Sequence, residues 1–527
     1  MQPSIPGGGL MRSPRRYPCA AALAAFFVAG GLSSAAAAAA TPPASRATAS
    51  DATFARLDAR FARLVADDHV PGLVYGVVID GALVHVGAFG VQDAASRRPV
   101  EPGSVFRIAS MTKNFTALMV LRLRDDGKLR LDDPVARYVP ELRSLAYPTT
   151  DAAPITVRDL LVHSSGLVTD NPWGDRQLDM SEAAFSKLMQ GGLGFARAPG
   201  LAHEYSNTSY AILGRVVANV AGAPYAEAVD AALLKPLGMT ASYWKVGQVP
   251  ASRRALGYSW ADGAWRQEPV LDDGAFAAAG GLHTTAGDYG RYVAWLLSAW
   301  PPRDGPDDGI LKRSSMREIV QGEGFVELTP GRPRSDDKPC PTPRTYGMGM
   351  YALADCELGA MLSHSGSLPG YTSYVVLSPS RRTGVFAFAN LTRAPLPAAV
   401  WDAMRMLDDD GRLRRALSAP SPALVEAKAA ILEAYGAGDI AAIEARLASN
   451  MLLDRPGPAW RADLGALRAA VGECSRFSGF DARSLRSASF TLECRAGEIR
   501  GSVLLAPTSA TLIQRLVLTA KPLASGR

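Results

Sequence analysis

The stretch FRIASMTKNFTALMVL, residues 106–121, places a serine and a lysine one helical turn apart inside an almost wholly apolar run. Ser110 and Lys113, at positions i and i+3, would share one face of a helix. No aspartate or glutamate stands three or four positions from Lys113 on this run, so the amine has no local ion-pair partner. A lysine buried there must find a distant partner or lose its proton, because burial disfavours the charged amine.

The Ser-x-x-Lys pattern occurs three times in the chain, and its surroundings separate the three copies. One copy lies in the charged, proline-rich segment RPRSDDKPCP, residues 332–341. Another lies in TASYWK, residues 240–245, where the intervening aromatics indicate an extended segment that turns the two side chains apart. Only Ser110 begins a long apolar helix, at its positive end. The alternative is that Ser110 is merely a helix N-cap and Lys113 extends to solvent.

Two later segments supply further hydroxyl, amide and imidazole groups. HEYSNTSYAILG, residues 203–214, contains Tyr205 and Asn207 in the only Tyr-x-Asn of the chain, immediately before an apolar helical run. SHSGSLPGYTSYVVL, residues 363–377, contains His364-Ser365-Gly366 directly before a pair of strands. A second His-x-Gly, at residues 85–87, lies inside an early hairpin, where strand packing is a sufficient explanation.

Ser-x-x-Lys, Tyr-x-Asn and His-x-Gly in this order resemble the serine β-lactamase and penicillin-binding-protein superfamily. The resemblance is closest to its branch of class C β-lactamases, D-Ala-D-Ala carboxypeptidases and related esterases. It covers about residues 54–400 and is supported by ITVRDLLVHSSGL (155–167), AAGGLHTTAGDYGRY (278–292) and YGMGMY (346–351). It implies an α/β (α+β) β-lactamase/transpeptidase-like fold, in which an antiparallel sheet is flanked by helices and joined by a helical subdomain.

The resemblance assigns a role to each motif. Ser110 would attack a carbonyl and form an acyl-enzyme. Lys113, desolvated and without a carboxylate, would take the serine proton. Tyr205 is the other candidate for the general base, and the choice between the two stays open. Asn207 would hold Lys113 in place and bind the amide or acyl portion of the substrate.

The third motif would form one wall of the site. Gly366 would let the strand edge approach the substrate closely, because it has no side chain. The backbone N–H groups of Ser110 and Ser367 would form the oxyanion hole. Many members of the superfamily carry Lys-Thr-Gly here, and the lysine attracts a substrate carboxylate. His364 and Ser365 replace its first two residues, and a histidine is only partly charged near neutrality. Esters and peptides are therefore as compatible with this site as β-lactams.

Hydrophobic patterns predict how the chain is organised. An amphipathic helix begins with FARLDARFARLVADD, residues 54–68, and two β-rich runs flank the turn at Asp80-Gly81. Residues 130–300 are mixed helix and loop, and strands return at 370–379 and 384–391. We therefore expect one antiparallel sheet assembled from both ends of a domain spanning residues 51–415. A small accessory α+β domain, residues 420–527, would begin with a helix capped by Ser421 and Pro422 and end in three strands.

The N-terminus has the features of a secretory signal peptide. Residues 1–40 contain three arginines, then an apolar run and small residues with several A-x-A cleavage sites, and residues 41–50 resemble a flexible linker. Removing this segment lowers the formal net charge from +6 to +3, because it contains three arginines and no acidic residue. We therefore expect bacterial-type export to the periplasm or outside the cell, with no stable membrane span after cleavage and no nucleic-acid partner.

Four of the five cysteines follow this segment, as two sequence-local pairs. Because an exported chain meets an oxidising compartment, we predict the disulfides Cys340–Cys356 and Cys474–Cys494. No His-Glu-x-x-His or paired Cys-x-x-Cys is present, so we expect neither a metal nor another cofactor. The chain also lacks the Gly-x-Ser-x-Gly turn of α/β-hydrolases.

These observations predict an exported serine hydrolase acting through Ser110 on a small-molecule or peptide substrate, such as a D-Ala-D-Ala-like peptide, an ester or a β-lactam. The alternative is a non-catalytic receptor of the same fold that binds cell-wall fragments or penicillin. The sequence does not choose the substrate, because loops such as GDRQLDMSEAAF (174–185) and GFVELTPGRPRSDDKP (324–339) would shape the pocket.

Overall fold

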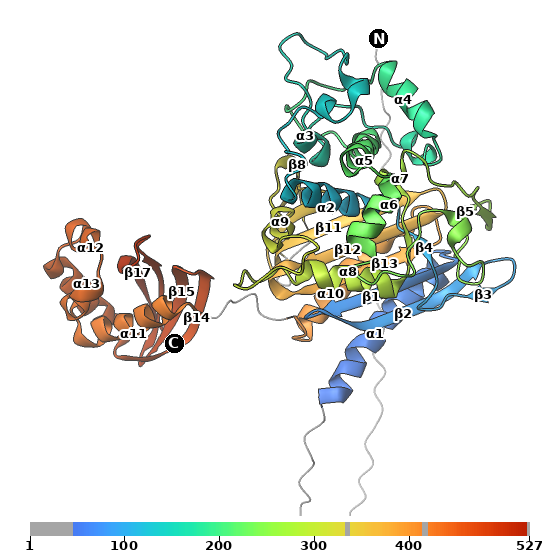
Figure 1. The fold of residues 1–527 in the computed structure, drawn as a ribbon. Coiled ribbons are helices and arrows are strands. Elements are labelled where there is room, and N and C mark those ends of the chain that lie inside the picture. Colours follow the sequence, from blue (N-terminus) through green and yellow to red (C-terminus); the bar gives the residue numbers. More distant parts are fainter. Residues whose placement is uncertain (1–45, 332–337, 414–419, 524–527) are drawn as a thin grey trace, which may run out of the picture. The chain divides into compact units, whose positions relative to one another are not determined.

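A computed structural model describes residues 46–331, 338–413 and 420–523 of the protein (Figure 1). The predicted signal peptide and residues 41–45 of the predicted linker lie outside the described residues. Helix α1, Arg46–Asp67, begins inside the expected linker, so residues 46–50 are helical. Pro42 and Pro43 precede this point, and no proline or glycine follows until the helix has ended, so nothing in the sequence interrupts it.

Within the described residues, the largest sheet has nine strands, all paired antiparallel, in the order β3-β2-β1-β13-β12-β11-β10-β9-β8. The strands are β1 Gly72–Ile79, β2 Ala82–Asp93, β3 Arg98–Pro99, β8 Gly324–Thr329, β9 Thr342–Tyr346, β10 Tyr351–Asp355, β11 Gly359–Leu368, β12 Tyr371–Ser378 and β13 Thr383–Ala389. Two short ribbons, β4 Phe106–Arg107 with β7 His283–Thr284 and β5 Tyr258–Ala261 with β6 Ala264–Gln267, lie outside this sheet.

The sheet is assembled from both ends of the domain, which confirms the prediction. Strand β1 pairs with β2 through the Asp80-Gly81 turn, and both turn residues have the positive φ that such a hairpin requires. On its other side β1 pairs with β13, with Leu73 opposite Ala389. Two segments more than three hundred residues apart therefore lie side by side at the centre of the sheet.

Both faces of the central strands are buried, and alternate residues serve different cores. In β13, Val385 and Ala387 pack in a core with α1 and α10, whereas Phe386 and Phe388 pack in the larger core on the opposite face. This alternation follows from the two-residue period of a strand. It explains why every side chain of β13 is buried although the strand lies in a single sheet.

Helices cover both faces of the sheet (Figure 1). Helix α10 packs on β12 and β13, and α8 packs on β1, β2 and β13 from the other face. Helices α3, α4 and α5 form the helical subdomain, and α2 packs against α5 and α7. The helices are α2 Thr112–Asp125, α3 Val157–Leu161, α4 Glu182–Gln190, α5 Asn207–Ala221, α6 Tyr225–Val229, α7 Ala277–Gly280, α8 Ala286–Leu297, α9 Arg313–Glu318 and α10 Leu396–Asp409. The predicted fold class is confirmed.

None of the helices within the described residues is both long enough and apolar enough to cross a membrane.

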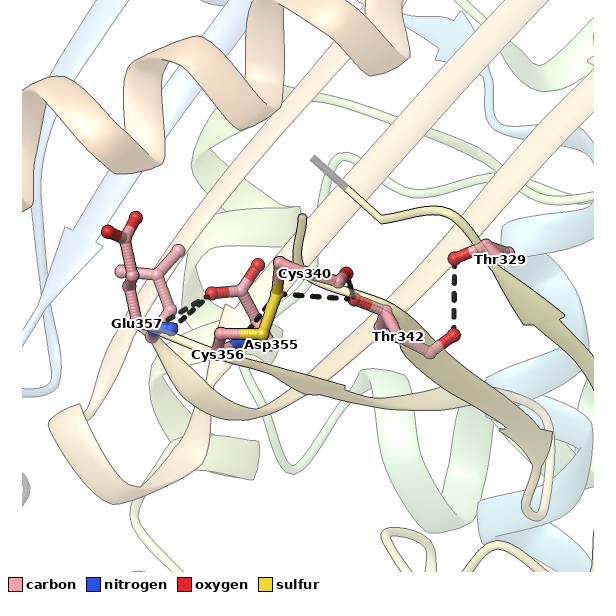
Figure 2. Close-up of a disulfide and its surroundings, with 7 residues drawn as sticks. Thr329, Cys340, Thr342, Asp355, Cys356 and Glu357 are labelled. Carbon is pink, nitrogen blue, oxygen red and sulfur yellow. Dashed lines mark hydrogen bonds between the residues drawn. A yellow bond between two sulfur atoms is a disulfide. The ribbon is translucent and has the colours of Figure 1, made fainter. Parts of the chain in front are cut away.

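Strands β8, β9 and β10 were not predicted, because their sequences lack clear alternation and two of them border a proline-rich segment. They extend the sheet beyond β11. The predicted disulfide Cys340–Cys356 closes the open end of the β9–β10 pair, next to β8 (Figure 2). Around it, Thr342 donates to the carbonyl of Cys340 at 3.0 Å, and Thr329 donates to the carbonyl of Thr342 at 3.1 Å.

The C-terminal domain has a hydrophobic core of its own. It contains α11 Pro422–Ala437, α12 Ser449–Asp454 and α13 Gly457–Val471, and Ser421 caps α11 as predicted. Its antiparallel sheet has the order β14 Cys474–Ser484, β15 Ser487–Cys494, β16 Gly497–Leu505 and β17 Ile513–Pro522. Three of these strands were predicted. The first was missed because bulges interrupt its alternation at three places.

The second predicted disulfide joins Cys474 and Cys494, which lie directly opposite one another on β14 and β15. It therefore holds the irregular edge strand β14 to the regular strand β15.

Replacing both Cys474 and Cys494 by serine is expected to lower the free energy of unfolding of the C-terminal domain by about 3 kcal/mol, because the unfolded chain regains loop entropy. Hydrogen–deuterium exchange of peptides from residues 474–522, followed against urea, measures this change. The matched Cys340→Ser/Cys356→Ser variant should leave these peptides unaffected and increase exchange in β9 and β10. Unchanged exchange of residues 474–522 in the first variant would contradict the expectation.

Candidate active site

Ser110 and Lys113 meet at the start of helix α2. Residues Ala109–Met111 form a 3-10 turn, and α2 follows at Thr112. Lys113 Nζ lies 3.0 Å from Ser110 Oγ, so the two side chains are hydrogen-bonded. The side chain of Ser110 caps neither helix, and Lys113 has no exposed surface. The alternative of a capping serine beside a solvent-directed lysine is therefore wrong.

Lys113 is held by neutral acceptors. Its Nζ donates to Asn207 Oδ1 at 2.7 Å and to the carbonyl of Ala279 at 2.8 Å. Among the described residues, no carboxylate lies within ion-pair distance of Nζ. Burial lowers the pKa of Lys113 to about 7, although Asp170 and Asp175 act in the opposite direction from farther away. A large fraction of this amine is therefore neutral at pH 7.

Asn207 is positioned by a carboxylate at the N-terminus of α5. Asp170 accepts the backbone N–H groups of Asn207 at 2.8 Å and Thr208 at 2.7 Å. It thereby satisfies two of the unpaired donors at the first turn of the helix. The side chain of Asn207 also donates to Asn171 Oδ1, which directs its own carbonyl oxygen toward Lys113. Tyr205 and Asn207 are thus brought to Lys113 by the loop that enters a helix, as predicted.

Tyr205 lies over the amine. Lys113 Nζ is 5.0 Å from the centre of the Tyr205 ring. Burial raises the pKa of the Tyr205 phenol well above 10, and a hydrogen bond with Ser110 only partly opposes this. On its other side the Tyr205 ring lies 4.4 Å, centre to centre, from the ring of His163, whose Nδ1 accepts the N–H of Ser206 at 3.2 Å. Burial lowers the pKa of His163 well below 6.5, so this imidazole is a neutral support for the tyrosine loop.

The third motif lies on β11, where Gly366 is required by contact. A Cβ at this position would come within 2.3 Å of the carbonyl of Ile108 and 2.2 Å of Ser373 Oγ. Ser373 itself donates to the Ile108 carbonyl at 2.7 Å, so the strands are fastened to the turn that carries Ser110. The glycine therefore serves the close approach of two chain segments, in addition to any role toward a substrate.

His364 differs from the expectation of a partly charged group. It is buried, and its ring nitrogens lie 3.0 Å from the Tyr346 hydroxyl and 2.6 Å from the Ser365 carbonyl. Burial, reinforced by the charge of Lys113, lowers the pKa of His364 to about 3. The imidazole is consequently neutral at pH 7 and supplies no cation to the site.

A cavity of about 460 Å³ opens over Ser110, and we refer to it as the Ser110 cavity. Of the predicted residues, five line it: Ser110, Tyr205, His364, Ser365 and Ser367. Lys113, Asn207 and Gly366 stand behind them and are buried. The structure therefore brings together all three motifs from distant parts of the chain.

Sequence reasoning missed several residues of the site. Asp170 positions the second motif, and Asp175 and Arg393 line the cavity. Asp175 lies in the loop 174–185 that was expected to shape the pocket, whereas no described residue of the loop 324–339 lines it. No sequence signal marked Arg393, which follows the last strand of the sheet and has a positive φ of 60°.

The Ser242/Lys245 copy of Ser-x-x-Lys does not form such a site. Ser242 is hydrogen-bonded to Thr284 at 2.8 Å and to Asp288 at 3.0 Å, and Lys245 is exposed. Ser335, in the remaining copy, lies outside the described residues.

Comparison with known proteins identifies the family. A family model described as Beta-lactamase matches residues 57–407, about two thirds of the chain. The chain belongs to the β-lactamase family. The matched region contains the three motifs and every strand of the nine-stranded sheet, and it excludes the C-terminal domain.

Two curated relatives are similar over the β-lactamase region. Protein flp of Staphylococcus aureus (strain NCTC 8325 / PS 47) is 26% identical over 343 residues, which are 63% of this chain and 62% of flp. This chain therefore spans less than two thirds of the length of that relative. The D-alanyl-D-alanine-carboxypeptidase/endopeptidase AmpH of Escherichia coli (strain K12) is 25% identical over 381 residues, covering 67% of this chain and 90% of AmpH.

Among solved structures, a class C β-lactamase matches with a TM-score of 0.53 and 20% identity, covering 67% of this chain and 96% of that chain. This confirms the predicted fold. The β-lactamase-family domain of this protein accordingly has the sheet and helical subdomain of the class C enzymes.

The Gly366→Ala variant is expected to lose reaction of Ser110 with covalent probes, because the added methyl group pushes β11 away from the Ile108–Ser110 turn. Overpacking of this kind costs about 1–3 kcal/mol, so the thermal midpoint should also fall. Differential scanning calorimetry and fluorophosphonate labelling measure the two effects. Gly247→Ala is the matched control, since a Cβ there meets nothing within 4 Å. Full labelling of a stable Gly366→Ala protein would show that the contact is not needed.

Proposed function

We propose that this β-lactamase-family protein is an exported serine hydrolase that acts by forming an acyl-enzyme on Ser110. The observation that carries the proposal is the hydrogen bond of 3.0 Å between Ser110 Oγ and a fully buried Lys113 with a pKa of about 7. A purely structural lysine would be expected to have a carboxylate partner or to reach solvent. This amine has neither among the described residues, and it can accept a proton near neutral pH.

The pKa directions support Lys113 over Tyr205 as the group that takes the serine proton. The Tyr205 phenol keeps its proton at neutral pH because burial raises its pKa well above 10. In the proposed acylation, Ser110 Oγ bonds to the substrate carbonyl carbon while its proton passes to Lys113. Tyr205 then donates its proton to the leaving group and regains one from the Lys113 ammonium as the carbonyl–leaving-group bond breaks. Water then attacks the acyl carbon while its proton passes through Tyr205 to Lys113. The proton returns from Lys113 to Ser110 Oγ as the ester bond breaks and the acid leaves.

The backbone N–H groups of Ser110 and Ser367 are proposed to hold the carbonyl oxygen. Both residues line the same cavity from opposite segments, the start of α2 and the strand β11. Donors fixed in the backbone stabilise the developing oxyanion without reorganising during the reaction. Ser365, exposed on the same strand, is proposed to bind the substrate through its hydroxyl.

A peptide, an ester or a β-lactam is the proposed substrate class. The cavity of about 460 Å³ is large enough for such a group. The name of AmpH supports D-Ala-D-Ala-like peptides, and the neutral His364 supports substrates that need no cation at the third motif.

Export to the periplasm or outside the cell is proposed from the signal-peptide pattern of residues 1–40. The two disulfides support it, because such bonds persist in oxidising compartments. The domain limits of 51–415 and 420–527 remain part of the proposal.

Ser110→Ala is expected to abolish covalent labelling by a fluorophosphonate or a penicillin probe, because the attacking oxygen is removed. Ser242→Ala, which alters another Ser-x-x-Lys copy, is the matched control and should be labelled fully. Intact-mass spectrometry of the mature protein measures the adduct. Undiminished labelling of Ser110→Ala would refute the proposed nucleophile.

The rate of fluorophosphonate labelling is expected to rise tenfold per pH unit below about pH 7 and to level off above it, because only the neutral Lys113 amine accepts the proton. Stopped reactions between pH 5 and 9 measure the profile. Tyr205→Phe should keep this profile, since fluoride leaves without needing a proton. Complete loss of labelling in Tyr205→Phe would instead identify the tyrosine as the base.

Turnover of nitrocefin, p-nitrophenyl esters and D-Ala-D-Ala peptides by the mature protein separates the hydrolase from the non-catalytic receptor. A receptor hydrolyses none of them.

A further inference from the structure

A second cavity, of about 330 Å³, adjoins the Ser110 cavity, and we refer to it as the outer cavity. The two share four lining residues: Pro172, Asp175, Ser367 and Arg393. They are therefore parts of one continuous groove that begins over the nucleophile. The outer cavity is closed on its far side by the β5–β6 hairpin, through Ser259, Trp260 and the following Glu268.

The outer cavity is lined by four charged side chains, two of each sign: Asp175, Glu268, Arg176 and Arg393. None of them is in an ion pair with another described residue. This differs from arginines elsewhere in the domain, such as Arg215, which is paired with both Glu141 and Glu182. Opposite charges thus face one space without closing on each other. Asp175 accepts a hydrogen bond from Asn207 Nδ2 at 3.4 Å, so Glu268 supplies the carboxylate that is available to a ligand, opposite the two arginines.

Arg393 and Glu268 are presented by well-anchored backbone. Beside Arg393, Thr392 Oγ1 accepts the N–H of Gly370 at 2.7 Å, which ties the turn to the end of β11. Glu268 follows β6, and its N–H donates to the carbonyl of Gly257 at 2.9 Å. Gly257 and Gly370 in turn pack so closely that a Cβ on Gly257 would lie 2.8 Å from the Cα of Gly370. The turns that carry the guanidinium and the carboxylate are consequently fixed relative to each other.

The direction of β11 indicates which part of a substrate reaches the outer cavity. His364, Ser365 and Ser367 line the Ser110 cavity, and Ser367 and the next two residues, Leu368 and Pro369, line the outer cavity. If the carbonyl oxygen of the substrate is held at the N–H of Ser367, an acyl chain that follows the strand enters the outer cavity.

We propose that the outer cavity binds a zwitterionic amino-acid group, with a free ammonium and a free carboxylate, on the acyl portion of the substrate. Arg393 binds its carboxylate and Glu268 binds its ammonium, and Arg176 and Asp175 complete the two charged sides. Charge-assisted hydrogen bonds to both groups select such a substrate over one that carries a single charge. This inference rests on the proposed acyl transfer at Ser110, and it identifies the substrate as a peptide whose acyl end carries an unblocked amino acid.

The test uses γ-glutamyl-D-alanine p-nitrophenyl ester, whose γ-linked glutamate keeps its α-ammonium and α-carboxylate. Three blocked forms are compared with it: N-acetylated, carboxamide and doubly blocked. For the wild-type protein, each block should lower kcat/KM by about tenfold or more, mainly through KM, since roughly 1.4 kcal/mol of binding is lost per contact. The release of p-nitrophenolate measures the rates.

The variants assign the two contacts. Arg393→Gln should remove the effect of blocking the carboxylate and keep the effect of acetylation, and Glu268→Gln should do the reverse. Arg266→Gln is the matched control, because Arg266 stands two positions from Glu268, pairs with Asp262 and does not line the cavity. For Arg266→Gln, the ratio of kcat/KM between the free ester and each blocked ester should equal that of the wild type. The proposal would be overturned if the wild-type protein hydrolysed free and blocked esters at equal rates. It would also be overturned if the ratio of kcat/KM between free and blocked esters were unchanged in both Arg393→Gln and Glu268→Gln.

A binding measurement separates this inference from the catalytic proposal. Calorimetric titration of γ-glutamyl-D-alanine into the Ser110→Ala protein should show binding that Arg393→Gln and Glu268→Gln each weaken. Absence of hydrolysis with this binding intact would remove the catalytic proposal and keep the subsite. Hydrolysis of esters without binding of the dipeptide would remove the subsite and keep the hydrolase.

Discussion

The burial of one amine that has no carboxylate partner among the described residues is the constraint on which the site depends. Lys113 lies beneath the protein surface between Ser110 Oγ, Asn207 Oδ1 and the Ala279 carbonyl, none of which carries a charge. An ion-pair partner in the same place would hold the proton on the amine and remove its ability to accept another. The nearby carboxylate of Asp170 does not contact the amine. It accepts backbone N–H groups at the N-terminus of α5 and so positions Asn207, whose side chain contacts the amine.

The sheet forms one wall of the site and must approach Ser110 very closely. Gly366 and the hydrogen bond from Ser373 to the Ile108 carbonyl bring β11 and β12 against the turn that precedes α2. The same packing buries His364 and keeps it neutral, so the third motif supplies no cation to the site. The exposed cation on the cavity wall is Arg393, which comes from beyond the end of the sheet. The positive charge on the groove wall therefore lies at Arg393, where the two cavities meet, and not at the third motif.

Much of the site could be predicted from the sequence because each motif is local. The i, i+3 spacing of Ser110 and Lys113, the loop before α5 and the strand after His364 all follow from short-range patterns. The central hairpin and the pairing of early with late strands followed from β-rich runs and the Asp80-Gly81 turn. Strands β8, β9, β10 and β14 were missed because proline-rich borders and bulges hide their alternation. Asp170 and Arg393 were missed because no local pattern records a contact between segments that are far apart in the chain.

The sequence by itself therefore determined which groups are candidates for the chemistry, the order of elements that presents them and the pairing of the four cysteines, since these depend on spacing and local geometry. The tertiary structure alone decided the charge state of those groups and the shape of the groove around them. Protonation depends on burial and on neighbours brought from distant parts of the chain. The pKa of the Lys113 amine is lowered and the pKa of the Tyr205 phenol is raised. Both are buried beside the same serine, and desolvation favours the neutral form of each, so the pKa falls for the amine and rises for the phenol.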